Sequence, residues 1–443
     1  MPTINSASSF SSDIENYIQD KTLPLVQRQL VAYQFGDALT LPKNRGTTYT
    51  ASRYDRINLP FAPLSEGVPP VGQSMTVAQV SATAQQWGDT VTVTDVADMT
   101  IKHPLFQTAI QLIAMQMSET MERNTFNNLM AGTQINYVNS RGARASLVAG
   151  DVLNPTEINR ATGALFTIGA PQFNGQMEED AKVTAGKPNS AGKTGHYVGI
   201  MHPLVEQDMR TNPTVVTAWS YSDIDKLYNN ELGQWGSLRF TRSNMVPSFT
   251  GVALVTGTPG TAGSLATNTY YIQVTGSIAQ NGYEQRIHQV SGGLAVTGPN
   301  GSISVTLPSV AGYVYNIYIG TTTSPTNLAA TASGPTTGPL AGQAVQLTGG
   351  ATVILTAVGT ARTPPAAPAT GVTVYPTFII GKNAYGQVKL DDAKFSYLKT
   401  ADKSDPLNQL RVCGWKVFYG TILLNQQFFM RIESTSAYSP TFG

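Results

Sequence analysis

The stretch that decides the fold is His103–Gly132, HPLFQTAIQLIAMQMSETMERNTFNNLMAG. Its apolar residues recur at intervals of three and four, which is the spacing of one face of an amphipathic helix; they are Leu105, Ala109, Leu112, Ile113, Met117, Met121, Phe126, Leu129 and Met130. Pro104 suits the first turn of a helix, and Gly132 suits its end. The spacing therefore predicts one helix with a length of roughly 40 Å.

Strand patterns precede this helix. Apolar and polar residues alternate over 47–57 and again over 75–96, most clearly at Thr90–Thr94. Between them lies 58–72, a Pro-rich segment that is expected to be an extended loop. We therefore expect a long two-stranded excursion at about 47–98. The preceding residues, 10–42, contain one helix candidate and resemble an arm more than a core.

The chain after the long helix mixes short helices with strands. We expect helices at Thr156–Phe166 and Pro203–Met209, and strands at Gly195–Met201, Leu238–Val246, Val372–Gly381 and Val412–Ser434. Strands separated from helices in this irregular order predict an α+β fold.

Charged residues are distributed unevenly. Only 12% of all residues are charged, against about 25% in an average protein. The segment 251–371 contains three charged residues, Glu284, Arg286 and Arg362. We take this charge-poor segment to be a domain inserted into the rest of the chain, which we call the host.

The charge-poor segment has the pattern of an all-β sandwich. The strand candidates TYYIQV (269–274), SISVTL (302–307) and YVYNIYIG (313–320) are separated by Gly- and Pro-containing turns. Tyr313, Tyr315, Ile317 and Ile319 fall on one face of the last strand. The spacing resembles a fibronectin type III or Ig-like module of the kind that phage structural proteins carry. The Pro-rich residues 363–371 predict a stiff connector.

Composition excludes several classes of protein. A net charge of +1 gives no basic field for binding nucleic acid. The one cysteine, Cys413, rules out a disulfide framework, and we expect it to be a small core residue. No signal peptide is evident at residues 1–20, and no apolar run is long enough to span a membrane.

Catalytic and metal-binding motifs are not evident. His196 and His202 could form a metal pair, but no acidic residue has matching spacing, so a structural role is favoured. Residues 178–180, Glu-Glu-Asp, could bind Ca²⁺, but a solvated turn is the favoured interpretation. We expect no enzyme activity, no catalytic residue, no cofactor and no metal.

Three groups of motifs, taken in order, carry a family resemblance. The first is LPKNRG (41–46) with EGVPP (66–70), and the second is QWGD (86–89) running to TDV (94–96). The third is YPT (375–377), GKNAYG (381–386), SDPLNQ (404–409), GWK (414–416) and RIES (431–434). Together they resemble the major capsid protein family of the coliphage N-four type, over about 25–250 and 372–435.

This resemblance implies the Hong Kong 97 phage capsid fold and a division of the chain. The parts are an N-terminal arm (1–46), an extended β-hairpin loop (47–101), a spine helix and peripheral domain (102–150 with 401–443), an axial domain (151–250 with 372–400) and the inserted Ig-like sandwich (251–371). The implied function is a major capsid protein that assembles into the icosahedral shell around the double-stranded DNA of a tailed phage.

The resemblance also implies partners and contacts. Copies of the chain would form pentamers and hexamers, with scaffolding, decoration and portal proteins as further partners. Packaged DNA would be contained without sequence-specific binding, and no membrane is involved. The shell would be assembled in the cytoplasm of the infected host cell and reside in the virion. We expect subunit contacts at Tyr49, Arg53, Arg56, Phe61, Leu64 and Trp87.

Some relatives join their subunits by a Lys–Asn isopeptide bond with the lysine on the extended loop. Residues 57–101 contain no lysine, so we expect a non-covalent shell. Three alternatives remain: a bacterial nanocompartment shell of the same fold, a β-rich phage tail or adhesion protein, and a glycan hydrolase with a β-accessory module. The last needs paired carboxylates, which are not evident.

Overall fold

The computed structural model describes residues 31–42, 44–54, 57–59, 63, 72–100, 105–173, 195–215, 231–278, 283–298, 300–333, 336–337, 346–398 and 409–439. The chain forms two compact units. Unit 1 comprises Met1–Gln27, Gln86–Ser118 and Asp391–Phe418, and unit 2 comprises Arg28–Gln85, Glu119–Leu390 and Tyr419–Gly443. The helix candidate before residue 31, the acidic residues 178–180 and most of the Pro-rich loop lie outside the described residues.

Four α-helices are described, and the long one agrees with its predicted bounds. They are α1 (Asp95–Thr100), α2 (Leu105–Met130), α3 (Pro155–Ile168) and α4 (Pro203–Thr211). The Asn154 side chain caps α3 by accepting a hydrogen bond from the Glu157 amide, and Gly169 ends that helix in the left-handed region, at φ 74°. Helix α1 differs from expectation, because the strand alternation continues in sequence to Val96 while the backbone turns helical at Asp95.

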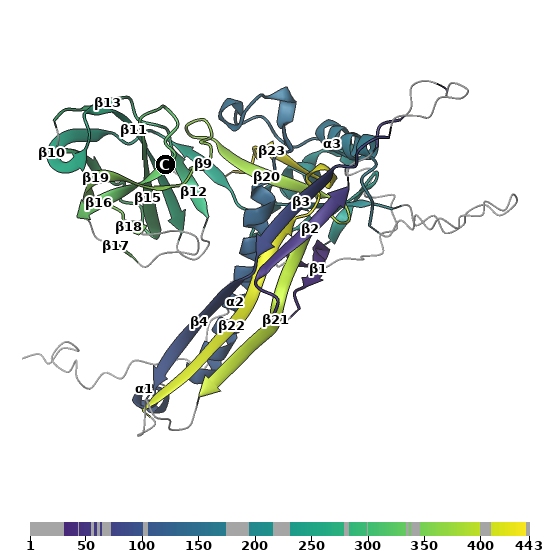
Figure 1. Ribbon diagram of the computed structural model, residues 1–443, viewed down its shortest axis with the longest axis horizontal. Helices are drawn as coiled ribbons and strands as arrows, with labels where there is room; N and C mark the ends of the chain where they lie inside the picture. The colour runs from purple at the N-terminus through teal and green to yellow at the C-terminus, as the bar shows by residue number, and fades with distance from the viewer. Residues whose placement is uncertain are drawn as a thin grey trace, which may run out of the picture. The chain divides into compact units, whose positions relative to one another are not determined.

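The two longest strands belong to a four-stranded sheet (Figure 1). Its order is β1 (Asp37–Thr40), β21 (Tyr385–Leu398), β22 (Leu410–Leu423) and β4 (Gln85–Thr94). β1 runs parallel to β21. Strands β21 and β22 have 14 residues each, and both contribute residues to unit 1 and to unit 2.

A mixed sheet forms the centre of unit 2. Its pairings give the order β5 (Ile135–Tyr137), β23 (Phe429–Ser434), β20 (Thr373–Ile380), β6 (Tyr197–Met201), β8 (Leu238–Arg242) and β7 (Glu231–Trp235). Strand β8 is shorter than the 238–246 that the sequence predicts. β20 lies between two partners and is buried over Val374–Ile380, which explains its continuous apolar sequence.

Both faces of this sheet are covered. Successive residues of β20 point to opposite faces of the sheet, and Phe378 and Ile379 accordingly belong to different hydrophobic clusters. The first cluster includes residues of α3 and α4, and the second includes the C-terminal part of α2. The long helix therefore contributes Phe126 and Leu129, which are fully buried, to the core of unit 2.

Residues 31–35 contribute side chains to the second of these clusters. Val31, Ala32 and Phe35 of the short 3-10 helix region η2 (Ala32–Phe35) are buried in the second cluster. The carboxylate of Glu122, on α2, accepts hydrogen bonds from the amides of Val31, Ala32 and Tyr33 at 2.7, 2.7 and 3.0 Å. Glu122 thus holds residues 31–33, which we call the strap, although it lies about 90 positions away in sequence. Sequence periodicity cannot reveal such a contact.

Within the charge-poor segment, the described residues form strands with a hydrophobic cluster of their own (Figure 1). The strands that follow β9 (Phe249–Val252) are β10 (Gly257–Leu265), β11 (Asn268–Ile278), β12 (Glu284–His288), β13 (Leu294–Val296), β14 (Gly301–Thr306), β15 (Tyr313–Gly320), β16 (Asn327–Ser333), β17 (Thr336–Thr337), β18 (Gln346–Thr348) and β19 (Thr352–Ala361). β11 pairs with β12, β13 and β15, while β14 pairs with β10 and β19. β16 joins the two groups by pairing with β15 and β19.

Strand β15 is buried on both faces, whereas its sequence pattern indicated a single apolar face. Tyr315, Ile317 and Ile319 belong to the hydrophobic cluster as expected. On the opposite face, Asn316 and Tyr318 donate hydrogen bonds to the Glu284 carboxylate, both at 2.7 Å. A search of the described residues finds no helix long and apolar enough to cross a membrane.

Candidate functional site

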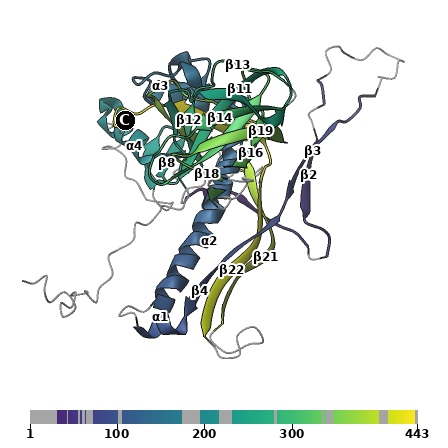
Figure 2. The ribbon, with the colours of Figure 1, turned by 90° about the vertical axis from the view of Figure 1, so that its left-hand side faces the viewer.

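Strands β2 (Thr48–Tyr54) and β3 (Val77–Thr83) form an antiparallel hairpin in unit 2 (Figure 2). The register runs without interruption from Thr48 opposite Thr83 to Tyr54 opposite Val77. Among the described strands, no third strand joins this sheet. Because two strands alone bury little surface, such a hairpin is only marginally stable in water unless something packs against it.

The base of the hairpin is anchored to its own chain. Tyr49 and Ala82 pack against a small cluster of buried residues, Leu41, Ala84, Val388 and Ile422. Arg53, which lies opposite Ala78 near the far end of β2, also donates a hydrogen bond from Nη1 to the Asn425 side-chain oxygen at 3.0 Å. These contacts fix where the hairpin leaves the core of unit 2.

The distal part of the hairpin exposes apolar side chains. The exposed fractions are 64% for Tyr54, 55% for Ile57, 78% for Leu59, 62% for Met75, 47% for Val77 and 37% for Val80. The sequence from Gly67 to Gly88 contains no charged residue. An apolar surface of this kind, concentrated on one element, is typical of a site of protein–protein interaction.

The strand edges add a second reason to regard the hairpin as an interaction surface. In a two-stranded sheet, the outer edge of each strand has backbone N–H and C=O groups that are not paired within the sheet. Natural proteins usually protect long edges with charged residues or proline. β3, with the sequence VAQVSAT, contains neither. Its backbone is therefore suited to pairing with a strand of another chain.

The structure describes three of the six expected contact residues. Tyr49 and Arg53 lie on β2, but both make contacts within their own chain, as given above. Trp87 lies on β4 in unit 1 and is partly exposed. Arg56, Phe61 and Leu64 lie outside the described residues. Sequence reasoning missed Tyr54, Met75 and Val77; the uncharged stretch 67–88 was a signal for Met75 and Val77 but not for Tyr54.

Unit 1 has exposed apolar residues of its own. They include Val96 and Met99 on α1, at 64% and 75%, and Leu112 on α2, at 46%. Within the unit, Trp415 donates from Nε1 to Gln116 at 3.1 Å, and Gln116 donates to Asp89 at 2.6 Å. Cys413 is buried, as the sequence indicated.

His202, which is partly exposed, has a structural role. Its Nδ1 accepts a hydrogen bond from the Leu204 amide at 3.2 Å and so caps α4. Its ring lies 4.7 Å from the ring of Tyr375. Burial lowers the pKa of His202 to about 4, so the ring is neutral at pH 7. His196 bridges to Phe173 through backbone hydrogen bonds, and the described residues contain no group of three metal-binding side chains.

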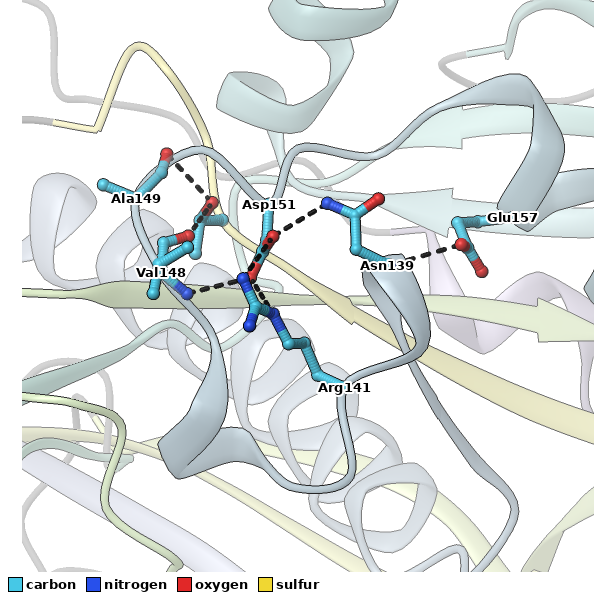
Figure 3. A network of polar contacts seen from close by, with 7 residues as sticks. Asn139, Arg141, Val148, Ala149, Asp151 and Glu157 are labelled. Atoms are coloured by element: carbon cyan, nitrogen blue, oxygen red, sulfur yellow. Dashed lines mark hydrogen bonds and ion pairs between the residues drawn. The ribbon is translucent and has the colours of Figure 1, made fainter.

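A network of polar contacts in the host surrounds Asp151 (Figure 3). Its carboxylate accepts hydrogen bonds from the side-chain Nδ2 of Asn139 at 2.8 Å, and from Arg141 Nε and the backbone amide of Val148 at 2.9 Å each. Burial acts to raise the pKa of Asp151, but these donors outweigh burial and lower it. Both oxygens of this carboxylate accept hydrogen bonds from groups of the surrounding loop. The carboxylate therefore stabilises the loop and is not poised to accept a proton.

Asn139 completes the same network. Its backbone is left-handed, at φ 57°, and its backbone N–H donates to the Glu157 carboxylate at 3.2 Å (Figure 3). Asparagine tolerates this conformation better than most residues. The network therefore holds the connection between β5 and α3 in a fixed shape.

Comparison with known proteins places this architecture among phage capsids. The capsid asymmetric unit of cyanophage Pam1 matches with a TM-score of 0.53 at 9% identity, covering 99% of this chain and 100% of that chain. The capsid of cyanophage P-SCSP1u matches at 0.49 with 11% identity, over 95% and 93% of the two chains. The capsid of Ralstonia phage GP4 matches at 0.49 with 9% identity, over 100% of both chains.

At these identities, the likeness is one of fold. The match to the Pam1 capsid indicates that the chain shares a phage capsid fold over its whole length. No protein-family model matches the sequence, and no curated protein does.

Proposed function

We propose that this protein is the subunit of a phage capsid shell. The observation that carries the proposal is the fold shared with the Pam1 capsid over 99% of the chain. The exposed apolar hairpin supports it, because a monomer gains nothing from Leu59 and Met75 at 78% and 62% exposure. A shell repeats each contact many times, so contacts that are weak alone suffice together.

The hairpin is the element that we assign to the contact between copies. Its distal apolar residues would be buried against a neighbouring copy, and its free strand edges would pair with that copy's backbone. Burial stabilises by about 1.5–3 kcal/mol for each large apolar side chain. Tyr54, Ile57, Leu59, Met75, Val77 and Val80 therefore provide enough apolar surface for association.

The finer assignment rests on the sequence motifs. We infer a member of the coliphage N-four-type major capsid protein family, with the arm, loop, peripheral and axial domains given above and an outward-projecting Ig-like insertion. Its shell would consist of pentamers and hexamers around double-stranded DNA, be assembled in the host cytoplasm and reside in the virion. Scaffolding, decoration and portal proteins are the further partners that this assignment implies.

Two exposed residues on the paired strands are the contact residues that we propose first. Tyr54 and Val77 are directly opposite each other in the register and are both exposed. Arg56, Phe61 and Leu64 remain candidates from the sequence. Tyr49 and Arg53 make contacts within the chain in this structure, so we assign both to holding the hairpin on its own subunit.

Electron microscopy of the expressed protein tests the proposal. We expect closed icosahedral shells. Monodisperse monomers or fibres would overturn the proposal and favour the tail or adhesion protein. Shells that package a co-expressed enzyme in place of DNA would favour the nanocompartment.

The absence of lysine from 57–101 predicts that the shell is held without covalent bonds between subunits. Boiled particles should therefore run as a single band at the subunit mass of 47.2 kDa on a denaturing gel. A ladder of subunit multiples would contradict this expectation without affecting the capsid assignment.

A further inference from the structure

The two ends of the charge-poor segment meet in a narrow neck. Gly251, on β9, donates to the Val372 carbonyl and accepts from the Gly371 amide, both at 2.9 Å. A side chain at Gly251 would not fit, because its Cβ would lie 2.2 Å from the Ala369 carbonyl oxygen. Chain entry and chain exit are therefore held side by side.

One strand pairing extends from the neck into the segment. β12 runs parallel to β9 over only three residue pairs, from Arg286–Thr250 to His288–Val252. A pairing this short restrains position but allows rotation about its own axis. Close packing around it would be needed to set one orientation.

Close packing is missing on one side of the neck. A cavity of about 550 Å³ lies there. Its lining includes residues of the host and of the charge-poor segment, among them Tyr137, Arg144, Phe249, Glu284, Arg362 and Arg431. This pocket is partly open to solvent. Tyr283 of the charge-poor segment packs into the second hydrophobic cluster of the host and donates to the Arg123 carbonyl at 3.4 Å. On the side of the connector, the contacts are polar.

Arg144, in the short 3-10 helix η4 (Arg144–Ser146) of the host, makes those contacts. Its Nε donates to Glu433 Oε2 at 2.7 Å and its Nη2 to Glu433 Oε1 at 2.5 Å. Its Nη1 donates to the carbonyl of Ala366, in the Pro-rich connector, at 3.1 Å. The guanidinium also lies 4.3 Å from the centre of the Phe249 ring. One side chain thus joins β23, the connector and β9.

The charge arrangement around Glu433 is that of a buried triad. Glu433 is fully buried, and Nε of Arg431, which is 4% exposed, lies 3.0 Å from Glu433 Oε1. Arg144 itself is 6% exposed. Buried ion-pair triads contribute little net stability, because desolvation offsets the attraction, and their best-supported use is to specify one arrangement.

The charged residues of the segment act on the same connector. Arg362 begins the exit from β19, and its Nη2 donates to the Glu284 carboxylate at 3.2 Å. Glu284 also accepts the hydrogen bonds from Asn316 and Tyr318. Two of the only three charges in 251–371 therefore fix the point from which the connector starts toward Arg144.

We propose that Arg144 is a positioning residue that latches the charge-poor segment in one orientation on the host. The short β9–β12 pairing is the hinge, and the adjacent cavity is the space into which the segment tilts when the latch is released. This inference does not depend on shell formation, since every contact lies within one chain.

The latch is testable by measuring distances within the full-length chain. Spin labels are placed on exposed cysteines introduced as Gln207→Cys, on α4, and Thr323→Cys, in the charge-poor segment, in a Cys413→Ala background. Pulsed electron spin resonance then reports the distribution of distances between them. We expect a single narrow distribution, and in Arg144→Met we expect its loss in favour of a broad one.

Two further variants complete the test. Arg144→Lys keeps the positive charge beside Glu433 and so preserves folding. Because lysine lacks the planar, forked guanidinium, it cannot bond to Glu433 and the connector together. This variant should therefore also broaden the distance distribution. Arg160→Met, which removes an exposed arginine paired with Glu157 on α3, is the matched control and should leave it narrow. An unchanged distribution in folded Arg144→Lys would overturn the latch.

Discussion

At the scale of single residues, the decisive groups are buried side chains that hold backbone from distant parts of the chain. Glu122 is 1% exposed and accepts three backbone hydrogen bonds from residues 31–33. The Tyr385 hydroxyl donates to the Ala32 carbonyl from the other side. The strap is therefore fixed by polar contacts as well as by burial of Val31 and Phe35.

Glu122→Ala should release this strap. Removing the carboxylate leaves three amides without their acceptor, and each unmade hydrogen bond of a buried group costs about 1–3 kcal/mol. Hydrogen exchange at residues 31–33 should accelerate by about a hundredfold, which corresponds to roughly 3 kcal/mol. Gln111→Ala, at an exposed position of α2, is the control. Unchanged exchange would show that burial alone holds the strap.

His202 predicts a pH dependence of stability. Its pKa is lowered from 6.5 to about 4 by burial, so the native state favours the neutral ring. Its contribution is fully present above pH 6.5 and is lost as the pH falls toward 4, by at most about 3 kcal/mol. His202→Asn keeps a cap for α4 and should reduce the slope of unfolding free energy against pH.

The slope in His202→Asn should not vanish, because the pKa of His288 is also lowered, mainly by burial. Urea unfolding at several pH values between 4 and 7 measures both contributions. An unaltered slope in His202→Asn would mean that His202 is solvated in the native state and that its capping geometry does not persist in solution.

At the scale of elements, the β2–β3 hairpin is the feature that packing within one chain does not explain. Its base packs against the chain through Tyr49, and Arg53, next to Tyr54, bonds to Asn425. Its distal end exposes Tyr54, Met75 and Val77. The physical consequence is an element that gains stability only when a second surface covers it.

The pair Tyr54→Ser and Val77→Ser should weaken assembly and leave the subunit intact. Exposed substitutions usually change folding stability by less than about 0.5 kcal/mol. Each lost apolar contact should cost about 1.5 kcal/mol or more at the interface, which is about tenfold in the concentration needed for assembly. Light scattering during assembly measures this concentration.

Gln79→Ser, at an exposed polar position of β3, is the matched control for these hairpin variants. It should assemble like the unaltered chain. Equal assembly of Val77→Ser and Gln79→Ser would remove the hairpin from the contact between copies, while the fold assignment would stand.

At the scale of the whole molecule, the charge-poor segment is joined to the host by adjacent backbone. Thr250 is paired with Thr373 and Phe249 with Val374, and paired residues in an antiparallel sheet lie about 5 Å apart. The host strands β9 and β20 therefore need only a short turn between them.

Deleting residues 252–370 and closing the gap with a short Gly-rich turn should leave a host that folds and still forms shells. The mixed sheet of unit 2 and its two hydrophobic clusters draw no residue from 252–370 except Tyr283. Electron microscopy of the deletion variant is the measurement. Failure to assemble in a folded variant would make the charge-poor segment a contact between subunits.

Much of this molecule is predictable from local patterns. The 3.6-residue periodicity of 105–130, the alternation in 48–54 and the Asn-Pro start of α3 are consequences of neighbouring residues alone, and their elements match the structure. The distribution of charge likewise marks the segment 251–371. Helix α1 was missed because six residues are too few for a periodic pattern.

What only the tertiary structure decided is which distant residues meet. Glu122 with the strap, Arg144 with Glu433 and the connector, and Glu284 with Arg362 are separated by 78 to 289 positions. Sequence spacing carries no information about such contacts, because they depend on how sheets stack and where loops close. By itself, the sequence determined the elements, the charge-poor segment and the family resemblance; the three-dimensional fold decided which surface stays uncovered and which charges hold the neck.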